Sequence, residues 1–347
     1  MTKPIAPFVT VVIPTLNEAQ RIEACLESVM AQDYPHDRFE VIIADGLSRD
    51  GTQERAAAFS ERYPQVRLVA NPKQIQAAAF NLGVKEGKGE IIIRMDAHAL
   101  YSNEYIRRCV EVLGETGAAN VGGLCQTQPG ADTLIAHTVA LMCMLWFGAG
   151  AARARRGGKA GPVDSVPFGA FRRETFARAG LMDERLVRGE DNEFNARIRQ
   201  KGMTVHFDPR IRLTYFTRPT VRAFLKQMFQ NGLYHVQTLM VNRGGCSLRH
   251  FVPFGFVMLL VACAVAGFIW SPAWYVGAGV LGLYLVANVV ASVHAAARHG
   301  WRYLVVLPWL FFVTHVCYGI GTLLGIFKFG FTASRGASGE SRPPTEQ

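Results

Sequence analysis

Three long apolar runs near the C-terminus restrict what this sequence can fold into. They cover about 251–270, 273–297 and 303–327, and almost no charged residue interrupts them. An α-helix rises 1.5 Å per residue, so each run is about long enough to cross a hydrocarbon core of ~30 Å. The pattern predicts that 249–330 forms a three-helix transmembrane anchor and that the rest of the chain folds separately.

The two connectors between these runs indicate how the anchor is oriented. The first, SPAW, carries no charge, whereas the second, ARHGWR, carries Arg298 and Arg302. Basic connectors stay on the cytoplasmic side, which places the second connector inside and the C-terminal tail outside. The N-terminus lacks the long apolar run of a signal peptide. We therefore expect a multi-pass protein of the inner membrane with a cytoplasmic N-terminal domain at 1–218.

The two segments that flank the anchor have their own patterns. Residues 219–248 begin with an amphipathic stretch that contains Arg222 and Lys226, and this predicts a helix lying at the membrane surface. The tail at 331–347 is polar and is predicted to be disordered.

An apolar stretch at 134–150 has 17 residues, which is near the short limit for a membrane span. It predicts a buried or interfacial helix rather than a span, and its contact with the membrane stays open. A basic, glycine-rich segment follows it and predicts a mobile loop. Its cations either meet a diphosphate or lipid head groups, or they belong to a solvated loop. They are Arg153, Arg155, Arg156 and Lys159.

Composition narrows the possible partners. The formal net charge is +10, which allows nucleic acid, anionic lipid or phosphorylated substrates. No zinc-finger spacing or basic helix array is present, so nucleic acid is not an expected partner, and basic groups beside apolar runs favour membrane lipid. The seven cysteines are odd in number and include no CxxC pair, so neither a disulfide framework nor a zinc site is indicated.

The N-terminal part of the chain alternates between strand and helix patterns. β-branched apolar runs predict buried strands, and apolar residues at helical spacing predict helices. Strands are expected at 8–14, 39–46, 66–71 and 90–96, helices at 18–31, 52–62, 75–87 and 190–202, and a strand, turn and helix at 163–180. This alternation predicts an α/β domain with a doubly wound, mostly parallel sheet. No GxGxxG loop follows the first strand, which disfavours a nicotinamide dinucleotide fold.

Acidic residues follow two of these strands, at the edge where parallel sheets bind ligands. Asp45 ends the second strand, and Asp96 ends the fourth, with His98 two positions later in GEIIIRMDAHALYS. Residues two apart in an extended chain point to the same side, so Asp96 and His98 would lie side by side. The pair could bind ribose hydroxyls and a divalent ion. Alternatively, Asp96 caps a turn and His98 packs against it.

Five segments together resemble the family 2 inverting glycosyltransferases. They are VVIPTLNE, VIIADGLSRDGT, IIIRMDAHA, VPFGAFRRETFARAGLMDERL and RGEDNEFNARI, in this order over roughly residues 8–235. The resemblance implies a GT-A fold that binds a nucleotide-sugar and a divalent metal. The strings DAHA, FGAFRR and EDNEFN resemble the membrane-anchored branch of succinoglycan glucosyltransferases, which build bacterial exopolysaccharide.

The resemblance implies roles for the positions that match the family's donor site. Asp45 matches the acid that contacts the nucleotide base, and Asp50 lies in the same turn, either as a donor-site residue or as a simple turn acid. The residues that match the family's first loop, where it touches the nucleoside, are Pro14, Thr15, Asn17 and Glu18.

The resemblance also implies a metal site. Asp96 matches the first acid of the family's DxD motif, which contacts ribose and metal, and His98 takes the last position, where a second Asp usually binds the metal. Because a ligating imidazole is neutral, this site would hold one less negative charge. We therefore expect a divalent metal cofactor, with Mn²⁺ favoured over Mg²⁺.

Asp191 matches the acid of the family's ED motif and is implied to be the catalytic base. An inverting transfer needs one carboxylate to take the acceptor's proton while a metal stabilises the leaving diphosphate. Glu190 and Glu193 are rivals on the same predicted helix. Helical geometry puts these two glutamates on one face and Asp191 about 100° away from Glu190, so one face is expected to meet the sugar.

The sequence favours transfer of a single sugar over processive synthesis. Where processive synthases carry QxxRW this chain reads QMFQN, with Gln230 and Asn231 in place of Arg and Trp, and three spans are few for a polymer channel. We expect transfer of a single sugar, glucose from UDP-glucose, onto a polyprenyl-diphosphate-linked saccharide. The alternatives are transfer onto polyprenyl phosphate itself, and a non-catalytic membrane scaffold that binds nucleotide-sugar.

Overall fold

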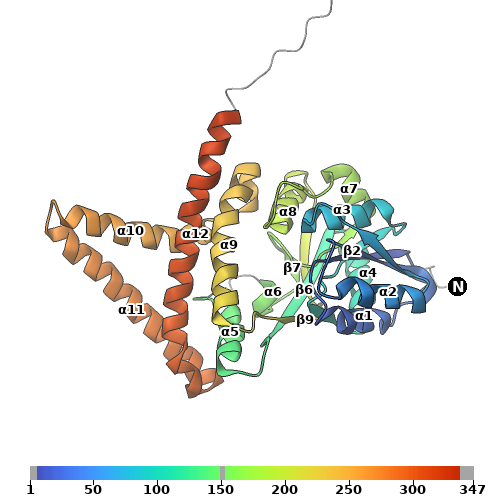
Figure 1. Ribbon diagram of the computed structural model, residues 1–347, viewed down its shortest axis with the longest axis horizontal. Helices are drawn as coiled ribbons and strands as arrows, with labels where there is room; N and C mark the ends of the chain where they lie inside the picture. The colour runs from blue at the N-terminus through green and yellow to red at the C-terminus, as the bar shows by residue number, and fades with distance from the viewer. Residues whose placement is uncertain (1–5, 149–152, 337–347) are drawn as a thin grey trace, which may run out of the picture. The chain divides into compact units, whose positions relative to one another are not determined.

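The computed structural model describes residues 6–148 and 153–336, with side chains as far as residue 330. The chain forms two compact units, one ending at Val221 and the other beginning at Arg222 (Figure 1). This division lies close to the boundary predicted after residue 218. Each unit is described separately below.

The N-terminal unit is built on one nine-stranded sheet with the strand order β3-β2-β1-β4-β8-β6-β9-β5, to which β7 adds by pairing with β9. β1 pairs in parallel with β2 and β4, as do β2 with β3 and β6 with β9, while β8, β5 and β7 run antiparallel to their neighbours. The strands are β1 Val9–Thr15, β2 Phe39–Asp45, β3 Val66–Ala70, β4 Ile91–Arg94, β5 Ala99–Tyr101, β6 Asn120–Gln128, β7 Gly161–Pro162, β8 Ala170–Arg172 and β9 Val205–Phe216. The sheet is therefore mixed and mostly parallel.

Helices cover both faces of this sheet because residues of the buried strands are apolar on both sides. Val11 and Ile13 of β1 belong to the core under α1 and α4, and Val12 belongs to the core under α3 and α8. The helices are α1 Ile22–Met30, α2 Thr52–Arg62, α3 Gln76–Glu86, α4 Tyr105–Thr116, α5 Leu134–Met144, α6 Arg153–Arg156, α7 Arg173–Ala179 and α8 Glu190–Gln200. Doubly covered strands explain the continuous apolar runs of the sequence.

The prediction for the end of the fourth strand was wrong. β4 ends at Arg94, and residues 96–98 form the turn into β5, which pairs antiparallel with β9. Because the chain turns back here, Asp96 and His98 are not neighbours on one extended strand, and the alternation argument does not apply to them. The first three predicted strands lie within one residue of β1, β2 and β3.

Two other predictions for the N-terminal unit can be compared with the structure. Within 134–150, α5 spans only Leu134–Met144 and is largely buried, as expected for a buried helix, and residues 149 and 150 lie outside the described residues. The basic segment begins with the short helix α6 rather than being irregular throughout. Its Arg155 side chain lies over the ring of Tyr215.

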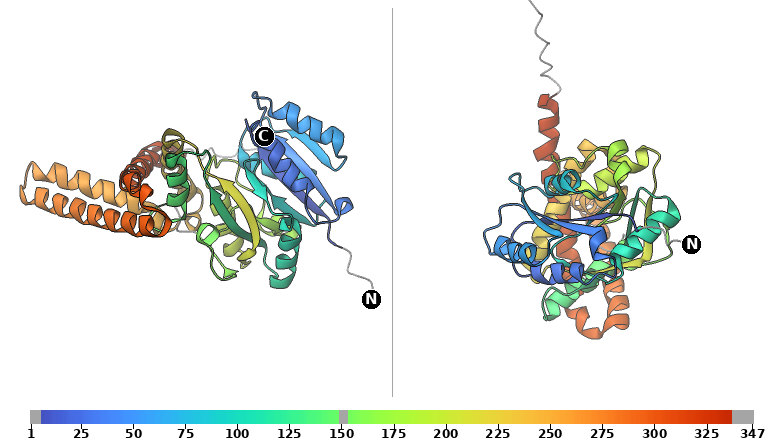
Figure 2. Two further views of the ribbon diagram at one scale, coloured as in Figure 1. Left: turned by 90° about the horizontal axis from the view of Figure 1, so that it is seen from below. Right: turned by 90° about the vertical axis from the view of Figure 1, so that its right-hand side faces the viewer.

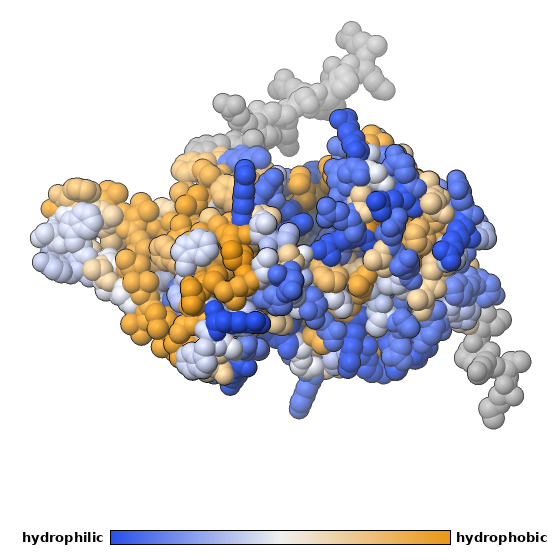
Figure 3. All heavy atoms as spheres, turned by 60° about the horizontal axis from the view of Figure 1, so that its bottom comes forward, coloured by the Kyte–Doolittle hydropathy of each residue, from blue (hydrophilic) through white to orange (hydrophobic). Residues whose placement is uncertain are grey.

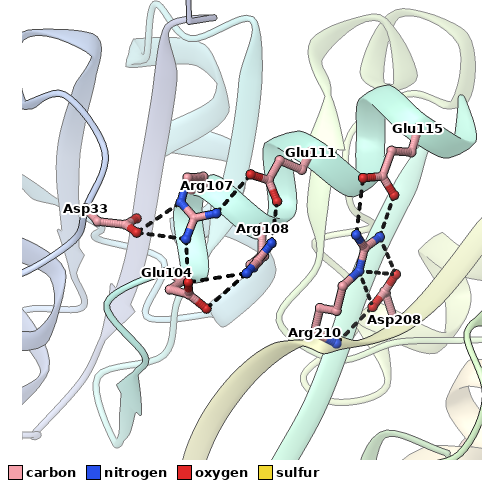
Figure 4. Close-up of polar contacts among 8 residues, drawn as sticks. All are labelled: Asp33, Glu104, Arg107, Arg108, Glu111, Glu115, Asp208 and Arg210. Carbon is pink, nitrogen blue, oxygen red and sulfur yellow. Dashed lines mark hydrogen bonds and ion pairs between the residues drawn. The ribbon is translucent and has the colours of Figure 1, made fainter.

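Exposed ion pairs join α4 to its surroundings (Figure 4). Arg107 binds Asp33, which precedes β2, and also Glu104 and Glu111 of its own helix region. Arg108 binds the same two glutamates. The pairs continue at the end of the helix, where Arg210 of β9 binds Glu115 and Asp208. We call this set, with Arg107, Arg108 and Arg210 as its cations, the α4 network.

The C-terminal unit consists of long helices. They are α9 Val221–Val241, α10 Val252–Gly267, α11 Pro272–His299 and α12 Leu307–Gly336, and Figure 2 shows α10 and α11 running side by side. Gly321 of α12 lets the backbone of α9 approach closely, because a Cβ at this position would lie 2.2 Å from the carbonyl oxygen of Phe229. The unit thus packs by helix-to-helix contact at small residues.

Three segments of this unit are long and apolar enough to cross a membrane, namely Leu248–Gly267, Pro272–His299 and Leu307–Gly330. They match the three predicted spans to within about four residues at each end. Many of their large apolar side chains are exposed, which produces the apolar surface visible in Figure 3. The predicted tail begins too early, because the backbone of 331–336 continues α12, and residues 337–347 lie outside the described residues.

Candidate active site

The carboxyl edge of the sheet carries a cluster of strained backbone positions. Asn17, Leu47 and Gln74 follow β1, β2 and β3, and Phe168 precedes the antiparallel β8, so all four lie at this edge. Each is a non-glycine residue with a positive φ, at 56°, 61°, 55° and 52° respectively. Such backbone strain gathers at ligand-binding sites, where the surrounding structure holds it in place.

The loops after β1 and β2 are tied together through Ser48. Asp45 is buried at the end of β2, and its carboxylate accepts hydrogen bonds from the Ser48 amide at 2.8 Å and the Ser48 hydroxyl at 2.6 Å. The Asn17 amide donates to the same hydroxyl at 2.8 Å, and the Asn17 side-chain oxygen accepts from the Arg49 amide at 3.0 Å. The predicted base-binding acid and the predicted nucleoside loop are therefore one rigid unit.

Asp50 has a structural task in this unit. Its carboxylate accepts from the Ala19 amide at 3.1 Å and from the Thr52 hydroxyl at 2.5 Å. The bond from Thr52 lowers the pKa of Asp50, so the group stays ionised. The Thr52 hydroxyl in turn accepts from the Glu18 amide at 2.8 Å. Asp50 thus closes the loop around the β1 and β2 ends, in agreement with the turn-acid alternative.

Pro14 and Thr15 are the last two residues of β1 and are both buried. The Thr15 hydroxyl donates to the carbonyl oxygen of Ile13 at 3.0 Å, so it is turned back toward its own strand. Both residues border the loop that begins at Leu16, whose side chain is exposed. They can therefore contribute to a donor site through the shape and backbone of the strand end.

Asp96 lies in the turn between β4 and β5 with a side chain that is 8% exposed. Its carboxylate accepts from Arg94 Nε at 3.0 Å and from the side-chain amide of Gln76 at 3.3 Å. Its backbone amide donates to the Tyr101 hydroxyl at 2.6 Å. These contacts come from α3, β4 and β5, and they fix Asp96 at the sheet edge.

His98 faces the first loop rather than Asp96. Its Nδ1 lies 3.2 Å from a carboxylate oxygen of Glu18, and its ring contacts the edge of Tyr215 with centroids 5.5 Å apart. The guanidinium of Arg155 also lies over the Tyr215 ring, 5.0 Å from its centroid. Sequence reasoning did not find Tyr215, because β9 was not among the predicted strands.

The side chains at this edge can supply part of a metal site. Glu18, Asp96 and His98 offer oxygen and nitrogen donors that suit Mn²⁺ or Mg²⁺. Among residues 6–148 and 153–330, no three such side chains are arranged to hold an ion by themselves. An ion held here would need phosphate oxygens to complete its coordination, which is how nucleotide sites commonly bind these metals.

Arg94 joins Asp96 to the acids of α8. Its side chain, which is only 3% exposed, donates from Nη1 to Glu190 at 3.0 Å and to Asp191 at 2.5 Å, and from Nε to Asp96. Gly189, with a φ of 80°, begins α8 and brings both of its first residues to this guanidinium. We call this set, Arg94 with Asp96, Glu190 and Asp191, the Arg94 cluster.

The three acids of α8 lie on the faces that the helical wheel predicts, because Glu190 and Glu193 are buried and Asp191 is less so, but their arginine partners follow a different division. Glu190 and Asp191 share Arg94, whereas the carboxylate of Glu193 accepts from Arg197 at 2.9 and 2.6 Å. Both first residues of α8 can bind Arg94 because the same guanidinium nitrogen, Nη1, contacts their two carboxylates. The Glu190 side chain is 7% exposed and that of Asp191 is 25% exposed. Of these two acids, Asp191 is the more accessible to a substrate.

The electrostatics of Asp191 suit proton transfer. Burial raises its pKa, the Arg94 guanidinium opposes this shift, and the neighbouring Glu190 and Asp96 charges add to it. The net direction is upward. A carboxylate whose pKa moves toward neutrality is a better proton acceptor near neutral pH than an ordinary surface aspartate. Asp191 can therefore act as a general base that is held in place by a cation.

Comparison with known proteins shows the family to which the chain belongs. The family model for glycosyl transferase family 2 matches residues 10–180. The chain is 31% identical over 269 residues to the succinoglycan biosynthesis protein ExoA of Rhizobium meliloti, covering 77% of this chain and 81% of that protein. It is 25% identical over 329 residues to a dolichyl N-acetyl-alpha-D-glucosaminyl phosphate 3-beta-D-2,3-diacetamido-2,3-dideoxy-beta-D-glucuronosyltransferase of Methanococcus voltae, covering 92% and 98%.

Solved structures share the fold. The mannosyltransferase PcManGT of Pyrobaculum calidifontis, in complex with GDP-Man and Mn²⁺, superposes with a TM-score of 0.60 at 23% identity and covers 94% of this chain and 88% of its own. S. aureus TarS in complex with UDP-GlcNAc gives a TM-score of 0.52 at 15% identity, covering 93% and 92%. The N-terminal unit is thus a mixed, mostly parallel α/β sheet of the GT-A type, followed by three long apolar helices.

Proposed function

Because the chain belongs to glycosyl transferase family 2, we propose that this glycosyltransferase moves a single sugar, glucose from UDP-glucose, onto a polyprenyl-diphosphate-linked saccharide with inversion. The observation that carries the proposal is the Arg94 cluster, in which Asp96 and Asp191 lie on one buried guanidinium. The Rhizobium relative is named as a succinoglycan biosynthesis protein. The Methanococcus relative is named as acting on a dolichyl-linked sugar phosphate. The name of the Methanococcus relative supports a lipid-linked acceptor.

The donor would lie along the carboxyl edge of the sheet. Asp45 and the strained β1 loop are positioned to bind the nucleoside, and the bonds through Ser48 hold them in that position. The nucleoside-binding residues are then Pro14, Thr15, Asn17, Glu18 and Asp45, with Asp96 at the ribose. A rigid, pre-formed donor site lowers the entropy lost on binding.

Asp96 and His98 would hold the divalent metal. When bound, the ion would neutralise charge that develops on the leaving diphosphate. His98 already lies against Glu18, so its imidazole is oriented before any ligand arrives. A neutral imidazole in the place of a carboxylate supports the preference for Mn²⁺ over Mg²⁺.

Asp191 would take the proton of the acceptor hydroxyl as that oxygen attacks the anomeric carbon. The step needs one carboxylate with an accessible oxygen, and Asp191 is the acid of the cluster that offers it. Arg94 donates to Asp191 Oδ1, which leaves Oδ2 to face the substrate. The proton leaves the hydroxyl, the new glycosidic bond forms, and the bond to the nucleotide breaks with UDP as the leaving group.

The apolar helices would anchor the enzyme at the cytoplasmic face of the inner membrane. The basic connector with Arg298 and Arg302 supports this orientation, because positive charge is retained on the cytoplasmic side. α9 would lie at the membrane surface and α10, α11 and α12 would cross it. A polyprenyl acceptor would then reach the site from the bilayer.

A donor panel tests this function. Membranes that contain the protein are incubated with UDP- and GDP-sugars and Mn²⁺, and both nucleotide release and the lipid product are analysed. The proposal predicts a sugar added to a lipid-diphosphate saccharide. A sugar found on a lipid monophosphate would instead establish the second reading, polyprenyl phosphate as acceptor. Release of no nucleotide from any donor would contradict both and would leave the scaffold reading.

A further inference from the structure

The guanidinium of Arg94 connects two segments that are about 95 residues apart in the sequence. It contacts the Asp96 carboxylate in the β4–β5 turn and the Glu190 and Asp191 carboxylates at the start of α8. The backbone amide of Arg94 also donates to the Gly169 carbonyl at 3.0 Å, so the residue belongs to the sheet itself. One rigid side chain thus spans the gap between the proposed donor acid and the proposed base.

We propose that Arg94 is a positioning residue for sugar transfer, which sets the Asp191 carboxylate at a fixed place relative to Asp96. The inference rests on the proposed function, because it takes Asp191 as the base and Asp96 as a donor-site acid. Neither sequence motif includes Arg94 as a functional residue. The only sequence signal is a charged side chain at the end of the buried IIIR run.

The chemistry of the guanidinium suits this task. Its Nη1 serves Glu190 and Asp191 while its Nε serves Asp96, so one planar group orders three carboxylates at once. Lysine offers a single point charge on a flexible stem and cannot reproduce this geometry. If Arg94 were absent, three neighbouring carboxylates would repel one another at low local dielectric and their side chains would rotate apart.

The charge balance indicates a role beyond packing. Three acids meet one cation in a buried cluster, and among the described residues Gln76 is the only other side chain that donates to the Asp96 carboxylate. A buried pair kept for stability alone is more favourable when its charges balance, because unpaired buried charge is costly. The excess of acid is suited to a ligand that brings a cation.

The test uses the full-length protein and variants of Arg94. Arg94→Ala and Arg94→Lys are compared with wild type and with Arg197→Lys, a matched control on α8 whose arginine binds Glu193. The turnover number is measured at saturating donor and divided by the number of UDP-binding sites. This ratio excludes unfolded protein, so a loss of stability alone does not change it.

We expect Arg94→Ala to lose about 100-fold in turnover per UDP site, since small misplacements of a reacting group cost this much. Arg94→Lys should lose at least tenfold, Arg197→Lys should stay within about threefold, and guanidinium ion added to Arg94→Ala should restore part of the activity. If Arg94→Ala does not fold, Arg94→Lys decides. A loss below tenfold in Arg94→Lys, or an equal loss in both lysine variants, would overturn the inference.

Failure of this inference can be told apart from failure of the proposed function. If wild type transfers sugar and Asp191→Asn does not, while Arg94→Lys remains normal, only the positioning role is wrong. If wild type itself transfers no sugar, the proposed function is wrong, and the inference is lost with it.

Discussion

The Arg94 cluster and the α4 network use the same groups in opposite environments. Both join arginine guanidinium groups to carboxylates at hydrogen-bonding distance, and both connect segments that are far apart in the sequence. In the α4 network the Arg107 side chain is 31% exposed and its partner Glu104 is 49% exposed, whereas Arg94 is 3% exposed. The two regions therefore compare a buried cluster with a set of ion pairs that is exposed except at Asp208.

The pKa of the acid shifts in opposite directions in the two regions. In the α4 network the hydrogen bond from Arg107 lowers the pKa of Glu104, and the bond from Arg210 lowers that of Glu115. In the Arg94 cluster the net shift of the Asp191 pKa is upward, because burial outweighs the arginine. The exposed pairs therefore favour the ionised form of their glutamates, while the buried cluster makes Asp191 a better proton acceptor.

The largest expected effect is the loss of the base. Replacing Asp191 with Asn should lower turnover by about 10²–10⁴-fold, because a positioned general base contributes this much. UDP binding should persist, because Asp191 is not among the residues proposed to bind the nucleoside. Enzyme assays and UDP titrations on one preparation check this. Retained turnover would show that Asp191 does not act as the base.

Glu190 offers a direct comparison inside the same cluster. Glu190→Gln keeps a carbonyl oxygen that can accept from Arg94, and the side chain is nearly inaccessible to substrate. Turnover should therefore stay within about tenfold of wild type, far above Asp191→Asn. If the two variants lose turnover equally, the assignment of the base to Asp191 is not supported.

A third prediction concerns the metal. His98→Asp restores a second carboxylate at the proposed metal site, which should improve the use of the harder ion Mg²⁺. We expect the ratio of Mn²⁺ to Mg²⁺ activity at equal low concentration to fall by about tenfold. Glu111→Gln serves as a control, because it removes a carboxylate of the α4 network and leaves the proposed metal site unchanged. An unchanged ratio in His98→Asp would contradict the proposed ligand role.

The pH dependence of stability should differ between the two regions. A raised pKa in the fold means that ionisation of Asp191 opposes folding, so its contribution is favourable at low pH and is lost as the pH rises through the folded pKa. Asp191→Asn should therefore gain in melting temperature relative to wild type as the pH rises from about 4 to about 7, and the difference should stay constant above that. Transfer by wild type should decline in the acidic direction, as the base takes up a proton.

The contribution of Glu104 to stability should change with pH in the opposite direction. Its pKa is lowered in the fold, so its stabilising contribution is present above the unfolded pKa and is lost as the pH falls through the folded pKa. The difference between Glu104→Gln and wild type should shrink in acid. A melting curve series that shows the same pH trend for Glu104→Gln and Asp191→Asn would remove the contrast between the two regions.

The smallest expected effect comes from the α4 network itself. Arg107→Ala removes the cation shared by Asp33, Glu104 and Glu111, yet exposed ion pairs contribute little to stability. The melting temperature should change by less than about 3 °C, and turnover should not change. A large loss of turnover would mean that α4 is coupled to the site.

The sequence predicts the fold well where its pattern is periodic. β1, β2, β3, α2 and the apolar helices are found close to the predicted ranges, because continuous apolar runs and helical spacing are local signals. β9 was not predicted, since Pro209 and alternating arginines interrupt its pattern, and its pairing with β6 is irregular between Gly122 and Leu124. Irregular strands depend on partners that no local window contains.

The candidate site shows the same difference between local signals, which the sequence reveals, and contacts between distant segments, which it does not. Asp45, Asp96 and Asp191 stand out from short motifs, each at the end or the start of an element. Their common partner could not be predicted, because the contact of Arg94 with α8 depends on the three-dimensional crossing of β4 and α8. The contact of His98 with Glu18 rather than Asp96 likewise depends on the turn into β5.

The anomeric configuration of the product tests the central claim most directly. Wild-type enzyme is given UDP-α-glucose and its lipid-linked acceptor with Mn²⁺, and the new linkage is assigned by NMR. Asp191 acting as a base rather than as a nucleophile predicts a β linkage, and this product should be absent with Asp191→Asn. An α linkage, or β-linked product formed equally well by that variant, would contradict the account.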